Sequence, residues 1–243
     1  MASLEKSLAK RVDKGSITPQ ERDAALERVS ATSDLGLLAD VDLVIESVVE
    51  DIAVKRHLFT ELDRICQPKA ILATNTSTLP VVDMAMETGR PEKVCGVHFF
   101  NPATVMSLVE IVRPLTASDE TIATAKAFAE ACGKTPVEVK DQAGFVVNAL
   151  LFPYLNNAVR LLEQGLASKE DIDAAMKGGC GFPMGPFALL DLVGLDTSLA
   201  ILDALYAEYR DPNYAPVPLL RRMVSAEKLG RKSGMGFYDY RKS

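Results

Sequence analysis

The stretch VCGVHFFNPATVMSLVEIV, residues 94–112, decides the fold and holds the clearest candidate site. Its two apolar runs, 94–100 and 108–112, are short and rich in β-branched residues, which is typical of buried strands in a parallel sheet. Glu110 lies inside the second run, and a buried carboxylate needs a partner because burying it alone costs free energy. We expect His98 to be that partner, since a carboxylate fixes the tautomer of an imidazole and raises its basicity, as a general base requires. The alternative is a buried pair that only satisfies its own hydrogen bonds.

The residues on either side of this stretch alternate between the two kinds of regular structure. Runs typical of strands lie at residues 29–33, 42–48, 70–74 and 136–140, and helical patterns lie at 3–14, 19–28, 52–65 and 119–131. Such an alternation predicts a parallel sheet with helices on both of its faces. We therefore expect residues 1–140 to form an α/β domain.

Beyond residue 140 the pattern becomes helical throughout. A long, mostly apolar helix is expected at 144–164, with a kink at Pro153, and shorter helices follow it. A glycine-rich and aromatic segment, 230–240, comes near the end of the chain. We therefore expect residues 141–243 to form a second, all-helical domain.

Composition and charge argue against several classes of protein. The 243 residues carry a net charge of −6, which gives no reason to expect nucleic acid or an anionic membrane as a partner. No apolar run reaches the roughly 18–20 residues that a membrane-spanning helix needs, and the first residues lack the apolar core of a signal peptide. The four cysteines are far apart without metal-binding spacing, so we expect free thiols. A cytoplasmic enzyme without a metal site is the expectation.

Polar side chains follow three strands of the predicted sheet, at the point where each strand ends. Glu50 follows strand 42–48, the loop 75–77 follows strand 70–74, and His98 ends the next strand. Ligands of open parallel sheets bind beyond the carboxyl ends of the strands, so these groups form a candidate site. Simpler roles are open for each: a helix-capping hydroxyl for the Ser77 loop, and for Glu50 and Lys55 a capping acid and a solvated lysine.

Asn148 interrupts the apolar sequence of the long helix. An amide at such a position faces inward or lies along a cleft between the two domains. A backbone-bonded amide and a contact on a dimer face are the alternatives.

Four motifs together resemble the 3-hydroxyacyl-CoA dehydrogenase family, and within it the short-chain 3-hydroxybutyryl-CoA type. They are NTS at 75–77, GVHFFNP at 96–102, LVE at 108–110 and GFVVN at 144–148; the segment KLGRKSGMGFYDY at 228–240 is similar too. The resemblance implies NAD-dependent oxidation of a (3S)-3-hydroxyacyl-CoA to the 3-ketoacyl-CoA, or the reverse. It also implies a homodimer formed through the helical domain.

The resemblance assigns a role to each matching residue. His98 would take the proton of the 3-hydroxyl as hydride leaves for the nicotinamide, and Glu110 would orient His98. Ser77 would hydrogen-bond the reacting oxygen, and Asn148 would lie near the substrate. The cofactor contacts would be Glu50, Lys55, Asn75 and Asn101, and the contacts to the coenzyme A portion would be Ser7, Lys10 and Lys14.

The sequence departs from this family at its front. A dinucleotide-binding domain needs a GxGxxG turn after its first strand, and no such motif occurs. We therefore expect an N-terminally truncated Rossmann-like domain in which strand 42–48 has a bare edge and 29–33 is a separate edge strand. A misplaced start at Met1, a fragment, and a missing part supplied by another chain are three explanations, of which the first is favoured. A non-catalytic acyl-CoA-binding or dimerising fragment is the alternative function.

Overall fold

The computed structural model describes residues 1–241, so the last two residues of the expected helical domain lie outside it. The strands are β1 Leu43–Glu46, β2 Ile71–Thr74, β3 Val94–Phe99, β4 Leu108–Arg113 and β5 Thr135–Lys140. The helices of the same half are α1 Ala2–Asp13, α2 Pro19–Glu27, α3 Ile52–Ile65, α4 Val81–Ala85 and α5 Asp119–Ala131. The helices that follow are α6 Val147–Glu163, α7 Lys169–Cys180, α8 Pro186–Val193, α9 Leu195–Tyr209 and α10 Pro218–Ser225. Short 3₁₀ turns lie at Leu35–Leu38, Pro91–Lys93, Pro212–Tyr214 and Arg231–Ser233.

The five strands form one sheet in the order β1-β2-β3-β4-β5. All neighbours are parallel except β3 and β4, which pair antiparallel. Residues 100–107 alone connect these two strands, and a parallel crossover needs about a dozen residues or more. The predicted α/β fold with a helical second half is confirmed, whereas the expectation that both strands of residues 94–112 run parallel is wrong for this one pair.

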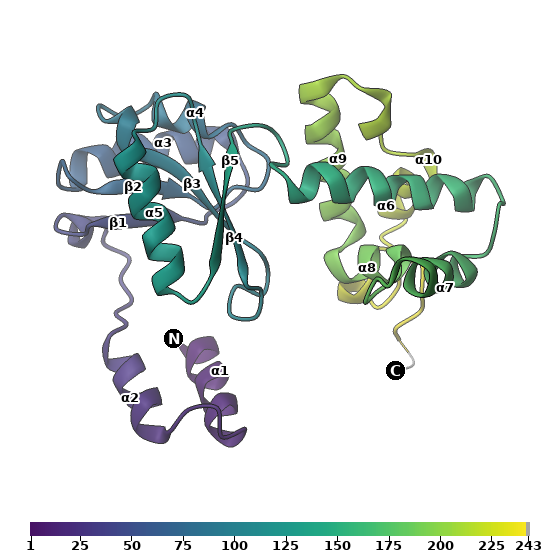
Figure 1. The fold of residues 1–243 in the computed structure, drawn as a ribbon, viewed down its shortest axis with the longest axis horizontal. Coiled ribbons are helices and arrows are strands. Elements are labelled where there is room, and N and C mark those ends of the chain that lie inside the picture. Colours follow the sequence, from purple (N-terminus) through teal and green to yellow (C-terminus); the bar gives the residue numbers. More distant parts are fainter. Residues whose placement is uncertain (242–243) are drawn as a thin grey trace.

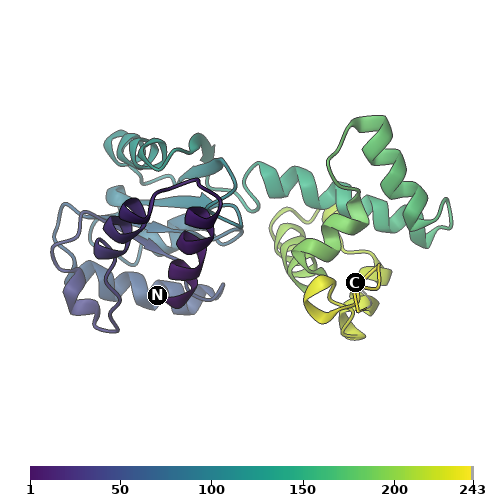
Figure 2. The same ribbon diagram turned by 90° about the horizontal axis from the view of Figure 1, so that it is seen from below.

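The sheet lies between helices, as the alternation predicted. One face packs on α3 and α4 through a cluster that includes Phe59, Leu62 and Met84, and the other face packs on α5 through Ile122 and its neighbours. Figure 2 shows the sheet between these two layers. The α3 face matters for the site, because His98, Glu110 and the ends of β1 and β2 direct polar side chains to it.

The segment before the sheet differs from the sequence prediction. Residues 29–33 form no strand, and Val29 is 42% exposed. They run as an extended connection from α2 toward β1 (Figure 1). A strand this short gains nothing without a neighbour to pair with. Within the described residues β1 is an edge strand, so the bare edge expected for strand 42–48 is observed.

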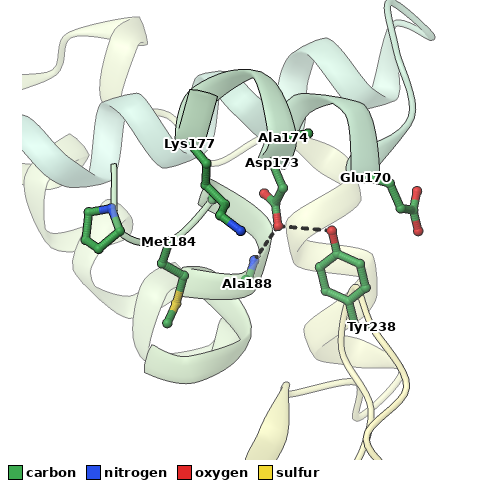
Figure 3. Close-up of a pocket in the computed structure, with 9 residues that line it drawn as sticks. Glu170, Asp173, Ala174, Lys177, Met184, Ala188 and Tyr238 are labelled. Atoms are coloured by element: carbon green, nitrogen blue, oxygen red, sulfur yellow. Dashed lines mark hydrogen bonds between the residues drawn. The ribbon is translucent and has the colours of Figure 1, made fainter. Parts of the chain in front are cut away.

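The second half packs around its own apolar core, which includes Phe152, Leu155, Phe187 and Leu202. Pro153 lies inside α6 as predicted. Asp173 of α7 accepts hydrogen bonds from the backbone N–H groups that open α8 and from the Tyr238 hydroxyl (Figure 3). A hollow of about 440 Å³ lies beside it, on elements that carry none of the predicted site residues. None of the helices in residues 1–241 combines the length and the apolar character required to cross a bilayer.

Candidate active site

His98 and Glu110 are direct partners across β3 and β4, on the same face of the sheet. The His98 Nδ1 lies 2.9 Å from Glu110 Oε2, and both side chains are buried. The other oxygen, Oε1, accepts hydrogen bonds from the backbone N–H groups of Val146 (3.1 Å) and Val147 (3.0 Å) at the start of α6. Glu110 therefore joins the sheet, the imidazole and the helical half of the chain.

These contacts decide which nitrogen of His98 is free. An ionised carboxylate can only accept hydrogen bonds, so Nδ1 donates to Glu110 and the neutral ring keeps its lone pair on Nε2. That nitrogen lies 3.1 Å from Ser77 Oγ. The rings of Phe100 and Phe145 lie 4.7 and 5.5 Å from the imidazole, centroid to centroid. The lone pair thus lies near two aromatic rings and beside a hydroxyl, where it can take a proton from an alcohol.

The loop that carries Ser77 is held by Glu50. Its Oε1 accepts hydrogen bonds from the Ser77 backbone N–H (2.9 Å) and from Thr76 Oγ1 (2.5 Å). The alternative of Ser77 as a helix cap is wrong: Asp141, at the end of β5, accepts from the first two N–H groups of α4 at 2.9 and 2.8 Å. The Ser77 hydroxyl is therefore available to His98.

The simpler roles proposed for Glu50 and Lys55 are wrong as well. The cap of α3 is Asp51, which accepts from the N–H groups of Ala53 and Val54. The Lys55 side chain is only 1% exposed, and its Nζ lies 2.7 Å from Glu46 Oε1 and 3.3 Å from Glu50 Oε2. Glu46 was missed by sequence analysis, although a glutamate inside the apolar run DLVIESV was a signal of a buried partner.

The three predicted asparagines have different environments. Asn75 bridges neighbouring loops, because its Oδ1 accepts from the Phe99 N–H (2.8 Å) and its Nδ2 donates to Ser47 Oγ (3.2 Å). Asn101 is exposed in the loop after β3. Asn148 is 8% exposed at the start of α6, and its amide has no hydrogen-bond partner among the described residues. An amide on a mostly buried residue that has no protein partner is available to a ligand.

Ser7 and Lys10 lie on α1 and Lys14 is the residue that follows its last turn, away from the group around His98. All three are exposed, and their spacing places them on one face of the helix. Helix α1 packs against α2, and the pair lies apart from the sheet in Figure 1. The structure therefore brings together His98, Glu110, Ser77, Glu50 and Lys55, and leaves the α1 residues as a separate cationic surface.

The rim of the sheet fits one end of a dinucleotide. The Glu50 side chain is 41% exposed, and a carboxylate at that position can accept the hydroxyl groups of a ribose. The described residues include no GxGxxG turn for the pyrophosphate, so the fit concerns the ribose and nicotinamide end. Among residues 1–241 no group of His, Cys, Asp and Glu side chains is placed to hold a metal ion.

Comparisons with known proteins cover both halves of the chain. Family models described as 3-hydroxyacyl-CoA dehydrogenase, NAD binding domain, and 3-hydroxyacyl-CoA dehydrogenase, C-terminal domain, match residues 1–142 and 144–240. A 3-hydroxybutyryl-CoA dehydrogenase of Mycobacterium tuberculosis is 50% identical over 97% of this chain and 83% of its own length. The enzyme of that name from Clostridioides difficile is 47% identical over 100% and 86%. The crystal structure of (S)-3-hydroxybutyryl-CoA dehydrogenase from Ralstonia eutropha, 42% identical, superposes with a TM-score of 0.96 over 98% of this chain and 84% of that one.

Proposed function

Because this chain belongs to the 3-hydroxyacyl-CoA dehydrogenase family, we propose that it catalyses the reversible, NAD-dependent oxidation of (3S)-3-hydroxybutyryl-CoA to the 3-ketoacyl-CoA. One observation carries the assignment of the site. His98 contacts Ser77 Oγ through Nε2 and Glu110 Oε2 through Nδ1. This is the arrangement of a general base with an orienting carboxylate.

The chemistry assigned to the residues follows from these contacts. The 3-hydroxyl of the substrate approaches His98 Nε2, and Ser77 Oγ hydrogen-bonds the same oxygen. His98 takes the hydroxyl proton as the C3–H bond breaks, and the Glu110 carboxylate stabilises the imidazolium that forms. NAD, when bound, supplies the acceptor for the hydride. General-base catalysis of this kind contributes roughly 10²–10⁴-fold to the rate.

The remaining polar groups take roles in binding. The amide of Asn148 has no partner in the described protein and lies beside the Val147 N–H that contacts Glu110, which supports a contact with the substrate. The half-exposed Glu50 carboxylate supports a contact with a ribose, and Lys55 Nζ lies 3.3 Å from Glu50 Oε2. Lys55, Asn75 and Asn101 are the further cofactor contacts of this proposal. Ser7, Lys10 and Lys14 supply a hydroxyl and two cations on one exposed face, which suits the phosphates of coenzyme A.

A homodimer formed through the helical half is part of the proposal. Apolar side chains remain exposed there: Val146, Leu150, Leu161, Leu166, Phe182 and Leu192. Val146, the residue that precedes α6, and Leu150 and Leu161 within it recur at helical spacing along one face, as expected for a surface that packs on a second copy. We further propose a cytoplasmic location, because all four cysteines are free thiols.

The test is reduction of acetoacetyl-CoA by NADH, followed as loss of NADH absorbance, for the wild type and His98→Gln. We expect His98→Gln to lower turnover by about 10³-fold while acyl-CoA binding stays largely intact. His57→Gln is the matched control, because His57 lies on the surface of α3 with its side chain 77% exposed. Equal loss of turnover and acyl-CoA binding would make His98 structural. Acyl-CoA binding without NADH binding in the wild type would favour a non-catalytic acyl-CoA-binding protein.

A further inference from the structure

A second buried carboxylate, Glu46, lies at the carboxyl end of β1, and the proposed chemistry does not use it. Its side chain is fully buried. It accepts hydrogen bonds from Lys55 Nζ (2.7 Å), Thr74 Oγ1 (2.7 Å) and the Val48 backbone N–H (2.6 Å). A buried carboxylate with three donors on three segments fixes the positions of those segments relative to one another.

Two routes lead from Glu46 to the loop that carries Ser77. In the first, Lys55 bridges Glu46 and Glu50, and Glu50 accepts the Ser77 N–H. In the second, Thr74 donates to Glu46 and accepts the Thr76 N–H at 3.1 Å. Both routes end on the residues next to His98.

The charge of Lys55 makes the first route, through Glu50, the more important one. Lys55 is a buried ammonium between two carboxylates, and it is closer to Glu46 than to Glu50. Glu46 therefore balances most of the lysine charge and leaves Glu50 Oε1 free to hold Thr76 and Ser77. If Glu46 were neutral, Lys55 would depend on Glu50 alone and would draw that carboxylate away from the Ser77 N–H.

We propose that Glu46 is a positioning residue, which holds Glu50 and Ser77 in register with His98 by balancing the charge of Lys55. The inference rests on the proposed function, because it explains how the loop that carries Ser77 is held in position next to His98.

The experiment measures the loop directly by amide hydrogen exchange of Ser77, followed by NMR on the full chain. We expect Glu46→Gln to accelerate exchange at Ser77 by about tenfold or more, because the bond to the Glu50 carboxylate is lost. Glu61→Gln, a half-exposed glutamate on α3, is the matched control and should leave this rate unchanged. In turnover we expect kcat to fall more than the affinity for acyl-CoA.

A double variant separates charge balance from packing. Glu46→Gln combined with Lys55→Met removes both buried charges, so Glu50 is no longer drawn inward and Ser77 protection should return to within a few-fold of wild type. Unchanged exchange in a folded Glu46→Gln protein, or no recovery in the double variant, overturns the proposal. If Glu46→Gln does not fold, Glu46→Asp keeps the charge but draws the carboxylate back from Lys55; faster exchange at Ser77 supports the proposal and an unchanged rate overturns it. Exchange needs no turnover, so a wild type without NADH activity would overturn the proposed function and leave this test readable.

Discussion

Glu110 in the sheet and Asp191 in the helical half accept the same kind of backbone donors, Glu110 through one oxygen and Asp191 through both, but contact different third partners. Each is buried and accepts two consecutive backbone N–H groups, those of Val146 and Val147 for Glu110 and those of Phe237 and Tyr238 for Asp191. Glu110 then contacts an imidazole, whereas Asp191 accepts a hydrogen bond from the Tyr240 hydroxyl at 3.2 Å.

The third partner, His98 for Glu110 and Tyr240 for Asp191, decides whether the carboxylate can take part in proton transfer or only stabilises the fold. An imidazole changes its charge near neutral pH and can pass a proton on. Burial, and then the Asp191 carboxylate, raise the pKa of Tyr240, and burial with the hydrogen bond to Asp173 raises the pKa of Tyr238 in the same way. Both phenols therefore stay neutral donors at any physiological pH. A buried carboxylate that accepts two backbone N–H groups serves the structure. It becomes part of an active site only when its remaining lone pairs accept from a group that can exchange a proton, as His98 can.

The largest effect is expected from Glu110→Gln. The glutamine oxygen can still accept the two N–H groups of α6, so its NH₂ must face His98. That group only donates, so Nδ1 must accept and the ring proton moves to Nε2, where it blocks proton uptake. By analogy with the wrong-tautomer variant of a catalytic triad, we expect turnover to fall by about 10³-fold or more, with an altered pH profile.

Steady-state turnover across pH measures this effect. Glu138→Gln is the matched control, since Glu138 on neighbouring β5 pairs at the surface with Arg113 and Lys126. A Glu110→Gln enzyme with wild-type turnover and an unchanged profile would remove Glu110 from the mechanism and make it another structural cap.

Asp191→Asn is expected to reverse this pattern. The NH₂ of asparagine faces the N–H of Phe237 or of Tyr238, so one buried donor loses its acceptor. We expect the free energy of unfolding to fall by about 2–3 kcal/mol, while turnover per folded molecule stays at the wild-type level. Urea denaturation with a parallel activity assay measures both quantities. A fall in turnover of folded protein would contradict the comparison between the two carboxylates.

Local sequence patterns predicted much of the fold and the centre of the site. The runs at 94–100 and 108–112 are strands, and the need of Glu110 for a partner pointed correctly to His98. Local caps were predictable too, because Thr18 and Ser168 bond residues only three positions further along the chain. Periodicity and near-neighbour chemistry suffice for features of this range.

Long-range partners were beyond such reasoning. Asp191 accepts hydrogen bonds from residues 46 and 47 positions later in the chain. Asp141 accepts them from residues 60 and 59 positions earlier. Nothing near either residue reveals those partners, since they depend on how the elements pack. The antiparallel pairing of β3 and β4 was within reach, because the connection is too short for a crossover. The prediction of a strand at 29–33 was wrong, because a strand needs a neighbouring strand to pair with and local sequence does not show whether one is present.

The smallest effect is a pH dependence that belongs to Asp191. Burial raises its pKa despite the two N–H donors and the Tyr240 hydroxyl. Because the folded pKa lies above the unfolded one, the contribution of Asp191 is fully present below the unfolded pKa and is lost as pH rises through the folded pKa. Asparagine does not titrate, so the stability gap between wild type and Asp191→Asn should widen as pH falls from 7 toward 4. Denaturation curves of both proteins at several pH values measure the gap. A gap that narrows toward low pH would contradict this prediction. It would mean that the hydrogen-bond donors lower the pKa of Asp191 by more than burial raises it.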